Sequence, residues 1–165
     1  ESAIFFAARG KASRVVVFEP LESNYGIIQK NIELNDQLEI DPYNLGVSSE
    51  TGSLTIASDH PPGSSAFGTG GSKFSIEINV ISWTELLSKA MSDDAYLIKS
   101  DCEGAEKFFI DVNHDLISKI PNYIFEIHTK SDQAAISYLF KSLGYKITCI
   151  KAISPEIAIY KYIKP

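Results

Sequence analysis

The sequence has few cysteines and no excess of basic residues, and each shortage excludes a class of protein. Only two cysteines, Cys102 and Cys149, occur in 165 residues, which is too few for the disulfide framework of a small secreted protein. We therefore expect a cytoplasmic setting. Lysine and arginine number 15 against 21 aspartates and glutamates. Nucleic-acid and anionic-membrane partners, which require basic patches, are therefore not expected.

Long hydrophobic runs are also missing. No apolar stretch approaches the roughly 20 residues that span a bilayer, so no membrane segment is expected. The chain begins at Glu1 and not at a methionine. We therefore expect a fragment or a processed chain. Its 165 residues, with 44% hydrophobic residues, suffice for one domain with a core of its own. We expect a single domain over residues 1–165.

Apolar segments of strand length alternate with segments of helical periodicity. The expected strands are Arg14–Glu19, Ile40–Val47, Ser53–Ala57, Phe74–Val80, Tyr96–Asp101, Tyr123–His128, Tyr145–Ile150 and Ile157–Ile163. The expected helices are Ser2–Ala8, Leu21–Leu34, Trp83–Met91, Glu103–Val112 and Gln133–Leu143. This alternation predicts an α/β fold, with a parallel sheet between helices and an antiparallel pair of strands at the end.

Three of the expected strands end on ionisable side chains. Glu19 precedes Pro20, Asp101 ends the segment from Tyr96, and Glu126 and His128 end the segment from Tyr123. Open α/β sheets bind ligands at the carboxyl ends of their strands, so we expect one polar rim. Taken alone, Asp101 is equally typical of a helix N-cap followed by acids in the first turn.

Five segments, in this order, resemble the FkbM family of S-adenosylmethionine-dependent methyltransferases. They are Val17–Pro20, Asn31–Asn35, Leu97–Glu106, Ile124–His128 and Leu143–Tyr145. The resemblance implies a Rossmann-like class I methyltransferase fold, mostly parallel with a C-terminal antiparallel strand. It implies methyl transfer from S-adenosylmethionine, with a hydroxyl oxygen of a small molecule or sugar as the acceptor.

The resemblance also implies a truncated N-terminus. The family begins with a strand and a glycine-rich turn, whereas Glu1–Phe6 resembles the helix that follows that turn. A sheet without its central strand leaves unpaired backbone groups on both neighbouring strands. We expect self-association, or direct pairing of the strands that contain Glu19 and Asp101.

The resemblance implies a cofactor-binding set at the strand ends. Glu19 would accept hydrogen bonds from the ribose hydroxyls, as an acid after the second strand does in nucleotide-binding α/β folds. Pro20 and Asp101 belong to the same set, and Val47 and Ser48 would lie against adenine. The alternatives are ordinary strand-end and turn residues.

Asp101, Glu103 and His128 are the candidate catalytic residues. His128 could be the general base, because its ordinary pKa lies near neutrality, and the alternative is a structural histidine at a strand end. Glu106 is expected to be a solvated or structural acid. Asp101, Glu103, Glu126 and His128 together could gather Mg²⁺ or Mn²⁺; strand alternation disfavours this, and no metal is assigned.

Three further hypotheses complete the sequence-based expectations. The loop His60–Ser72, rich in Gly, Pro and Ser, is either a lid over the substrate or a loop without function. A strand-end acid also binds the ribose of NAD, so an NAD-dependent oxidoreductase is one alternative function. A non-catalytic remnant of a methyltransferase domain is the other.

Overall fold

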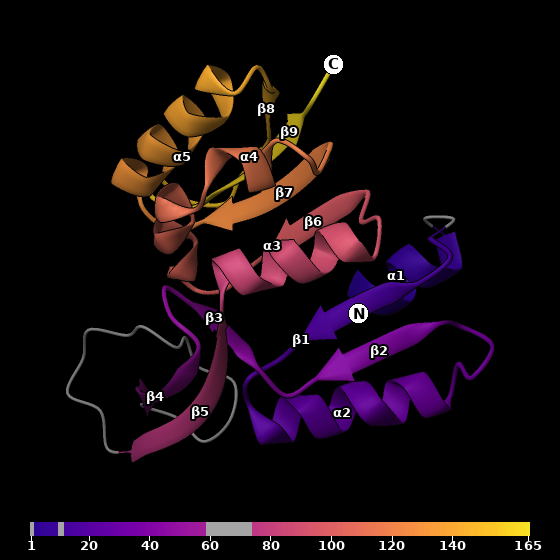
Figure 1. The fold of residues 1–165 in the computed structure, drawn as a ribbon. Coiled ribbons are helices and arrows are strands. Elements are labelled where there is room, and N and C mark those ends of the chain that lie inside the picture. The colour runs from indigo at the N-terminus through magenta and orange to yellow at the C-terminus, as the bar shows by residue number, and fades with distance from the viewer. Residues whose placement is uncertain (1, 10–11, 59–73) are drawn as a thin grey trace. The chain divides into compact units, whose positions relative to one another are not determined.

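A computed structural model describes residues 2–9, 12–58 and 74–165, whose helices and strands are drawn in Figure 1. The chain forms two compact units. The first consists of Glu1–Gly46 and Gly52–Val80, and the second of Val47–Thr51 and Ile81–Pro165. The boundary between the units falls within two strands, β3 and β5, whose bounds are given below. The expectation of a single domain stays a prediction.

The first unit opens with two helices and a parallel pair of strands. Its first four elements are α1 (Ser2–Arg9), β1 (Val15–Phe18), α2 (Glu22–Glu33) and β2 (Ile40–Tyr43). The strands β1 and β2 pair in parallel, with Val15 opposite Ile40 and Phe18 opposite Tyr43. These elements confirm both predicted helices and the first predicted strand to within two residues.

A three-stranded sheet follows, and it corrects one prediction. Its strands are β3 (Gly46–Ser48), β4 (Gly52–Ser58) and β5 (Phe74–Ser82), in the order β3-β5-β4. The predicted strand Ile40–Val47 is wrong, because it is divided between β2 and β3. Asn44 lies in the break, and its Nδ2 donates to the carbonyls of Glu19 and Pro20, at 2.9 and 3.2 Å. The predicted antiparallel pairing of β4 with β5 is confirmed.

The glycine that begins β3 lies in a closely packed position. A Cβ atom at Gly46 would lie 3.2 Å from the Cβ of Pro20 and 3.3 Å from side-chain carbons of Ile78 and Val80. Ile78 and Val80 are themselves buried, in an apolar cluster that also contains Leu21 and Ile56. A larger side chain at Gly46 would therefore push against the core of the first unit.

The second unit contains one mixed sheet and the helices beside it. Its elements are α3 (Trp83–Ser92), β6 (Leu97–Ser100), the 3₁₀ helix η1 (Ala105–Asp111), α4 (His114–Ile117), β7 (Asn122–Ile127), α5 (Lys130–Ser142), β8 (Lys146–Ala152) and β9 (Ala158–Ile163). The strand order is β6-β7-β9-β8. Strands β6 and β7 are parallel, whereas β9 is antiparallel to both of its neighbours.

Aromatic side chains form the core of the second unit. Phe109, Tyr123, Phe125 and Phe140 are all 0% exposed, and their rings contact one another edge-to-face, stacked or tilted. Trp83, 2% exposed, lies edge-on against Phe109, and its Nε1 donates to the carbonyl of Ala105 at 3.0 Å. Such packing holds β7 and η1 in a fixed relation.

The expected sheet is only partly confirmed. The described strands form three separate sheets that contain both parallel and antiparallel pairs, so the prediction of one mostly parallel sheet is wrong for these residues. The reason is that β1 hydrogen-bonds to β2 and β6 to β7, and β1 and β6 belong to different sheets. Direct pairing of the strands next to Glu19 and Asp101 is therefore not observed. The predicted antiparallel pair at the C-terminus is confirmed.

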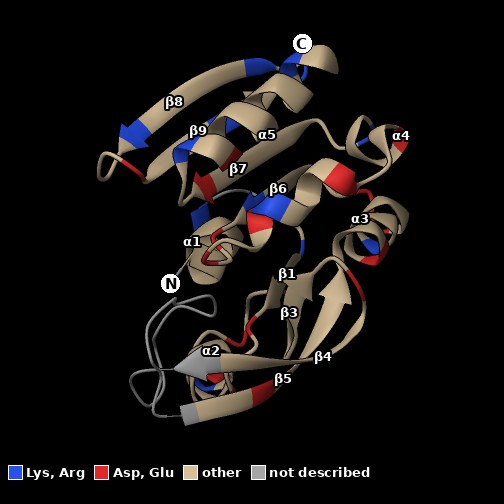
Figure 2. Ribbon diagram, turned by 90° about the vertical axis from the view of Figure 1, so that its left-hand side faces the viewer, with Lys and Arg blue, Asp and Glu red and all other residues tan. Residues whose placement is uncertain are grey.

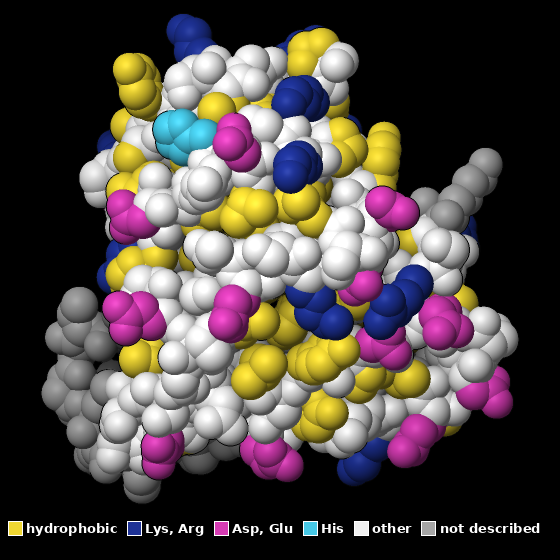
Figure 3. Space-filling view, in the orientation of Figure 1, with side chains coloured by type: hydrophobic (Ala, Val, Ile, Leu, Met, Phe, Trp, Pro, Cys, Tyr) yellow, Lys and Arg dark blue, Asp and Glu magenta, His cyan; other side chains and the backbone are white. Residues whose placement is uncertain are grey.

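Charged residues of both signs are interspersed along the chain. Figure 2 shows acidic and basic positions on helices and strands of both units, and on the face in Figure 3 no continuous basic area is present among the described residues. None of the described helices combines the length and the apolar character needed to cross a bilayer.

Candidate functional site

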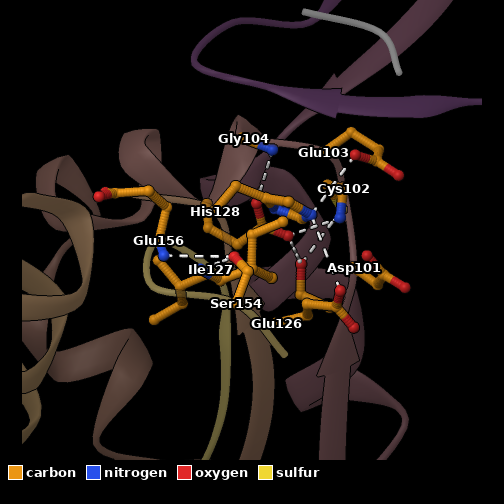
Figure 4. A network of polar contacts seen from close by, with 12 residues as sticks. Asp101, Cys102, Glu103, Gly104, Glu126, Ile127, His128, Ser154 and Glu156 are labelled. Carbon is orange, nitrogen blue, oxygen red and sulfur yellow. Dashed lines mark hydrogen bonds and ion pairs between the residues drawn. The ribbon is translucent and has the colours of Figure 1, made fainter. Parts of the chain in front are cut away.

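Two neighbouring strands of the second unit end in ionisable side chains. In the parallel pairing of β6 with β7, Ser100 lies opposite Phe125. Continuing this register by one residue places Asp101 beside Glu126, on the same side of the sheet. His128 follows two positions later and shares that side, because side chains alternate along a strand. The sequence thereby gathers Asp101, Glu126 and His128, as Figure 4 shows.

Distances confirm that these side chains form one group. One ligand atom each of Asp101, Glu126 and His128 lies within 4.8 Å of the others. The Nε2 atom of His128 is 3.4 Å from Oε2 of Glu103 and 3.8 Å from Oε1 of Glu126. Lys99 adds a positive charge, with its Nζ 4.0 Å from Oδ2 of Asp101. The structure therefore brings together the three predicted catalytic residues and Glu126.

Burial differs across this group. The imidazole of His128 is 16% exposed and the side chain of Glu126 is 22% exposed, whereas Glu103 is 49% exposed. The inner part of the group, His128 and Glu126, is thus mostly shielded from solvent, whereas Glu103 lies at an open rim. The Nδ1 atom of His128 is buried and has no hydrogen-bond partner among the described residues.

Glu106 has a structural role. It is 1% exposed, and its carboxylate accepts hydrogen bonds from Ser100 Oγ at 2.8 Å, from the Cys102 backbone N–H at 2.5 Å and from the Gly104 backbone N–H at 3.0 Å. These bonds fix the turn after β6, in which Glu103 has a φ of 51° and Gly104 a φ of 101°. Of the two roles expected for Glu106, the structural one is confirmed.

The electrostatics of the site follow from burial and from neighbouring carboxylates. Burial, and then the charge of Asp101, raises the pKa of the Glu126 carboxyl above its ordinary value. Burial, and then the charge of Glu106, raises the pKa of the Cys102 thiol to about 12. Cys102 is therefore protonated at neutral pH and is not a nucleophile. Both cysteines are free.

The predicted ribose acid lies in the first unit, directly after β1. Oε1 of Glu19 accepts hydrogen bonds from the Leu21 backbone N–H at 3.0 Å and from Nδ2 of Asn24 at 3.4 Å. Leu21 is the N-cap residue of α2, so Glu19 supports the start of that helix. Within the described part of the chain, its Oε2 has no hydrogen-bond donor. Pro20 follows it and lies against Gly46.

The predicted adenine contacts lie in β3. Val47 is 9% exposed and Ser48 is 4% exposed, so both side chains are buried in the protein. Their contact with adenine stays a prediction. The loop His60–Ser72, predicted to be a lid or a loop without function, lies outside the described residues.

Sequence reasoning missed Lys99 as a member of the site. Lys99 and Asp101 are two residues apart at the end of β6, and this spacing was the available signal, because alternate residues share a face of a strand. The three hydrogen bonds of Glu106 were also missed. They depend on the positive φ angles at Glu103 and Gly104, for which the sequence offers only the glycine as a sign.

Comparison with known proteins identifies the family. The family model described as the Methyltransferase FkbM domain matches residues 1–147 of the 165-residue chain. Comparisons with curated proteins and with solved structures give no significant match. The family match spans both units and includes Glu19, Asp101 and His128. The chain therefore belongs to the FkbM methyltransferase domain family.

Proposed function

We propose that the protein transfers a methyl group from S-adenosylmethionine to a hydroxyl oxygen of a small molecule or sugar. The family match over residues 1–147 is the observation that carries this proposal. The group Asp101, Glu103 and His128 supports it, because methyl transfer needs chiefly an aligned acceptor and a nearby proton acceptor.

The residues after β1 suit the cofactor. Oε1 of Glu19 already accepts two hydrogen bonds, which hold the side chain in place. Oε2, the other oxygen of the carboxylate, would accept hydrogen bonds from the vicinal hydroxyls of a ribose. The family match implies S-adenosylmethionine, and Glu19 with Pro20 would hold its nucleoside. Val47, Ser48 and Asp101 are the other proposed contacts.

The residues after β6 and β7 suit the acceptor. S-adenosylmethionine supplies an electrophilic methyl carbon, whose bond to sulfur breaks with the electron pair going to sulfur as the new carbon–oxygen bond forms. Asp101 and Glu103 would orient the acceptor hydroxyl. His128 would receive the proton of that hydroxyl at an imidazole nitrogen, and Glu103, 3.4 Å away, would stabilise the resulting positive charge.

Calorimetry tests the cofactor. The chain should bind S-adenosylhomocysteine, the demethylated product, more tightly than NAD. Equal or tighter binding of NAD would overturn the proposal and favour the oxidoreductase, and binding of neither would favour the non-catalytic remnant.

Release of S-adenosylhomocysteine tests the reaction. The chain is incubated with S-adenosylmethionine and a panel of sugars and other hydroxylated compounds. A His128→Gln variant should lose activity with the productive acceptor, whereas His114→Gln, at an exposed position in α4, should retain it. Acceptors methylated at nitrogen, with none methylated at oxygen, would contradict the proposed acceptor.

A further inference from the structure

The group at the ends of β6 and β7 contains more ligand atoms than a proton acceptor needs. Asp101, Glu126 and His128 offer two carboxylates and one imidazole, with their ligand atoms within 4.8 Å of one another. Glu103 adds a third carboxylate at the rim. Lys99 is the single cation recorded beside them in the described residues, and its Nζ is 4.0 Å from Asp101. The gathered negative charge is thus only partly neutralised.

The contacts inside the group are too long for hydrogen bonds. Nitrogen–oxygen hydrogen bonds span about 2.7–3.2 Å, whereas Nε2 of His128 is 3.4 and 3.8 Å from its two carboxylate neighbours. Ligands bound about 2.1 Å from one cation lie roughly 3.0–3.5 Å from each other. Among the three proposed ligands, the 3.8 Å spacing between His128 and Glu126 exceeds that range by a few tenths of an ångström. All three ligand atoms lie within 4.8 Å of one another, so side-chain shifts of about 1 Å would close them on one ion.

One nitrogen of the imidazole lacks a hydrogen-bond partner within the described residues. His128 is 16% exposed, and its Nδ1 is buried without a hydrogen-bond partner in the described part of the chain. Buried polar atoms are almost always satisfied by protein, water or a ligand. The imidazole of His128 thus has one nitrogen without a partner and the other facing carboxylates beyond hydrogen-bond range, so neither nitrogen is fixed by a hydrogen bond within the described residues.

From this geometry we infer that Asp101, Glu126 and His128 bind a divalent cation, with Mn²⁺ as the best-fitting ion. Carboxylates suit Mg²⁺, Ca²⁺ and Mn²⁺, whereas imidazole suits the transition metals, and Mn²⁺ accepts both. Three protein ligands leave coordination positions open, and an acceptor oxygen would bind there. With the cation bound, His128 is a ligand, so the hydroxyl proton would pass to the carboxylate of Glu103 at the rim in place of His128; this last step rests on the proposed function, whereas cation binding does not.

Titration of the 165-residue chain with Mn²⁺, followed by electron paramagnetic resonance of the free ion, tests the inference. We expect one bound Mn²⁺ per chain. Glu126→Gln and His128→Gln should each weaken binding at least tenfold. The matched controls Asp111→Asn and His114→Gln, both at exposed positions of the same unit, should bind as the unchanged chain does. Equal binding by the His128→Gln variant would overturn the inference.

A second measurement does not depend on variant stability. Electron spin echo modulation of the bound Mn²⁺ should show coupling to an imidazole ¹⁴N in the unchanged chain. Absence of that coupling, or failure to bind Mn²⁺ at millimolar concentration, would exclude the site. Neither result would bear on methyl transfer, which is measured separately by binding and release of S-adenosylhomocysteine.

Discussion

Replacement of Glu106 by alanine should destabilise the second unit strongly. The carboxylate is 1% exposed and accepts three hydrogen bonds, two of them from backbone N–H groups of the turn after β6. Alanine leaves all three donors without their acceptor and creates a small cavity. The two backbone donors belong to a turn that leads directly into buried Ala105, which limits their freedom to find other partners.

The magnitude follows from these contacts. A hydrogen bond to a charged group contributes about 1.5–3 kcal/mol, and three would sum to roughly 4.5–9 kcal/mol. Contacts within one network are not additive, and water would enter the opened turn. We therefore expect Glu106→Ala to lower the free energy of unfolding by about 3–5 kcal/mol, the loss typical of breaking a buried charged network.

Two variants make the measurement specific. Glu106→Gln keeps one carbonyl oxygen but turns an amide N–H₂ group toward a backbone donor, so its loss should be about 1–3 kcal/mol. Asp111→Ala removes an exposed acid at the end of the same 3₁₀ helix and should change stability by less than about 0.5 kcal/mol. Urea unfolding followed by far-ultraviolet circular dichroism gives all three values.

Thiol reactivity provides a second readout in the folded state. The charge of Glu106 contributes to the raised pKa of Cys102, so the Glu106→Gln variant should react faster with a thiol reagent. Cys149, which is exposed, is first replaced by serine so that Cys102 is the single thiol. If Glu106→Ala lost less than 1 kcal/mol and Cys102 stayed equally protected, the proposed support of the turn would be refuted.

Three further predictions concern other positions. Glu19→Gln keeps the Oε1 acceptor for Leu21 but removes the charge, so the affinity for S-adenosylhomocysteine, measured by calorimetry, should fall roughly ten- to a hundredfold. Glu33→Gln, at an exposed position of α2, should have no effect on that affinity. Unchanged affinity of the Glu19→Gln variant would make Glu19 purely structural. The raised pKa of Glu126 means that its contribution to stability is fully present below its ordinary value of 4.5 and is lost as the pH rises through the higher folded-state pKa. With chelator present, Glu126→Gln should therefore raise the melting temperature at pH 7 more than at pH 4, and an equal gain at both would contradict this cause. Gly144 follows the C-cap residue of α5 and has a φ of 83°, so Gly144→Ala should lower the free energy of unfolding in urea by about 1 kcal/mol, whereas no loss would show that the turn relaxes.

The sequence predicted local elements well because their signals are local. The expected helix Trp83–Met91 begins directly after Ser82, a residue type favoured at N-caps, and the Ser82 side chain accepts from the Glu85 backbone N–H. The α4 helix, His114–Ile117, was missed because four residues are too few to establish a periodicity. Strand pairing is non-local, so the division of the described strands into three sheets could not be predicted from the strand segments themselves.

The candidate site was predictable to the extent that it follows from strand ends. Asp101 and His128 were expected to meet because parallel strands bring their carboxyl ends together, and they do. Strand alternation suggested that Glu126 and His128 need not reach that edge, yet both contribute to the group. Glu103 and Glu106 both follow β6, and residue type alone could not show that Glu106 is the buried one. Only the turn conformation separates the acid at the rim from the acid that holds the loop.

The chain has a single tryptophan, and its burial against Phe109 gives that residue a practical value. Trp83 lies in the second unit, so its fluorescence reports the folding of that unit. Circular dichroism, in contrast, sums the helices of both. Coincidence of the two signals during denaturation would show that the units unfold as one cooperative body, and separate midpoints would show that each has its own transition. The natural sequence thus already carries a spectroscopic label for the half of the molecule that contains the acidic group.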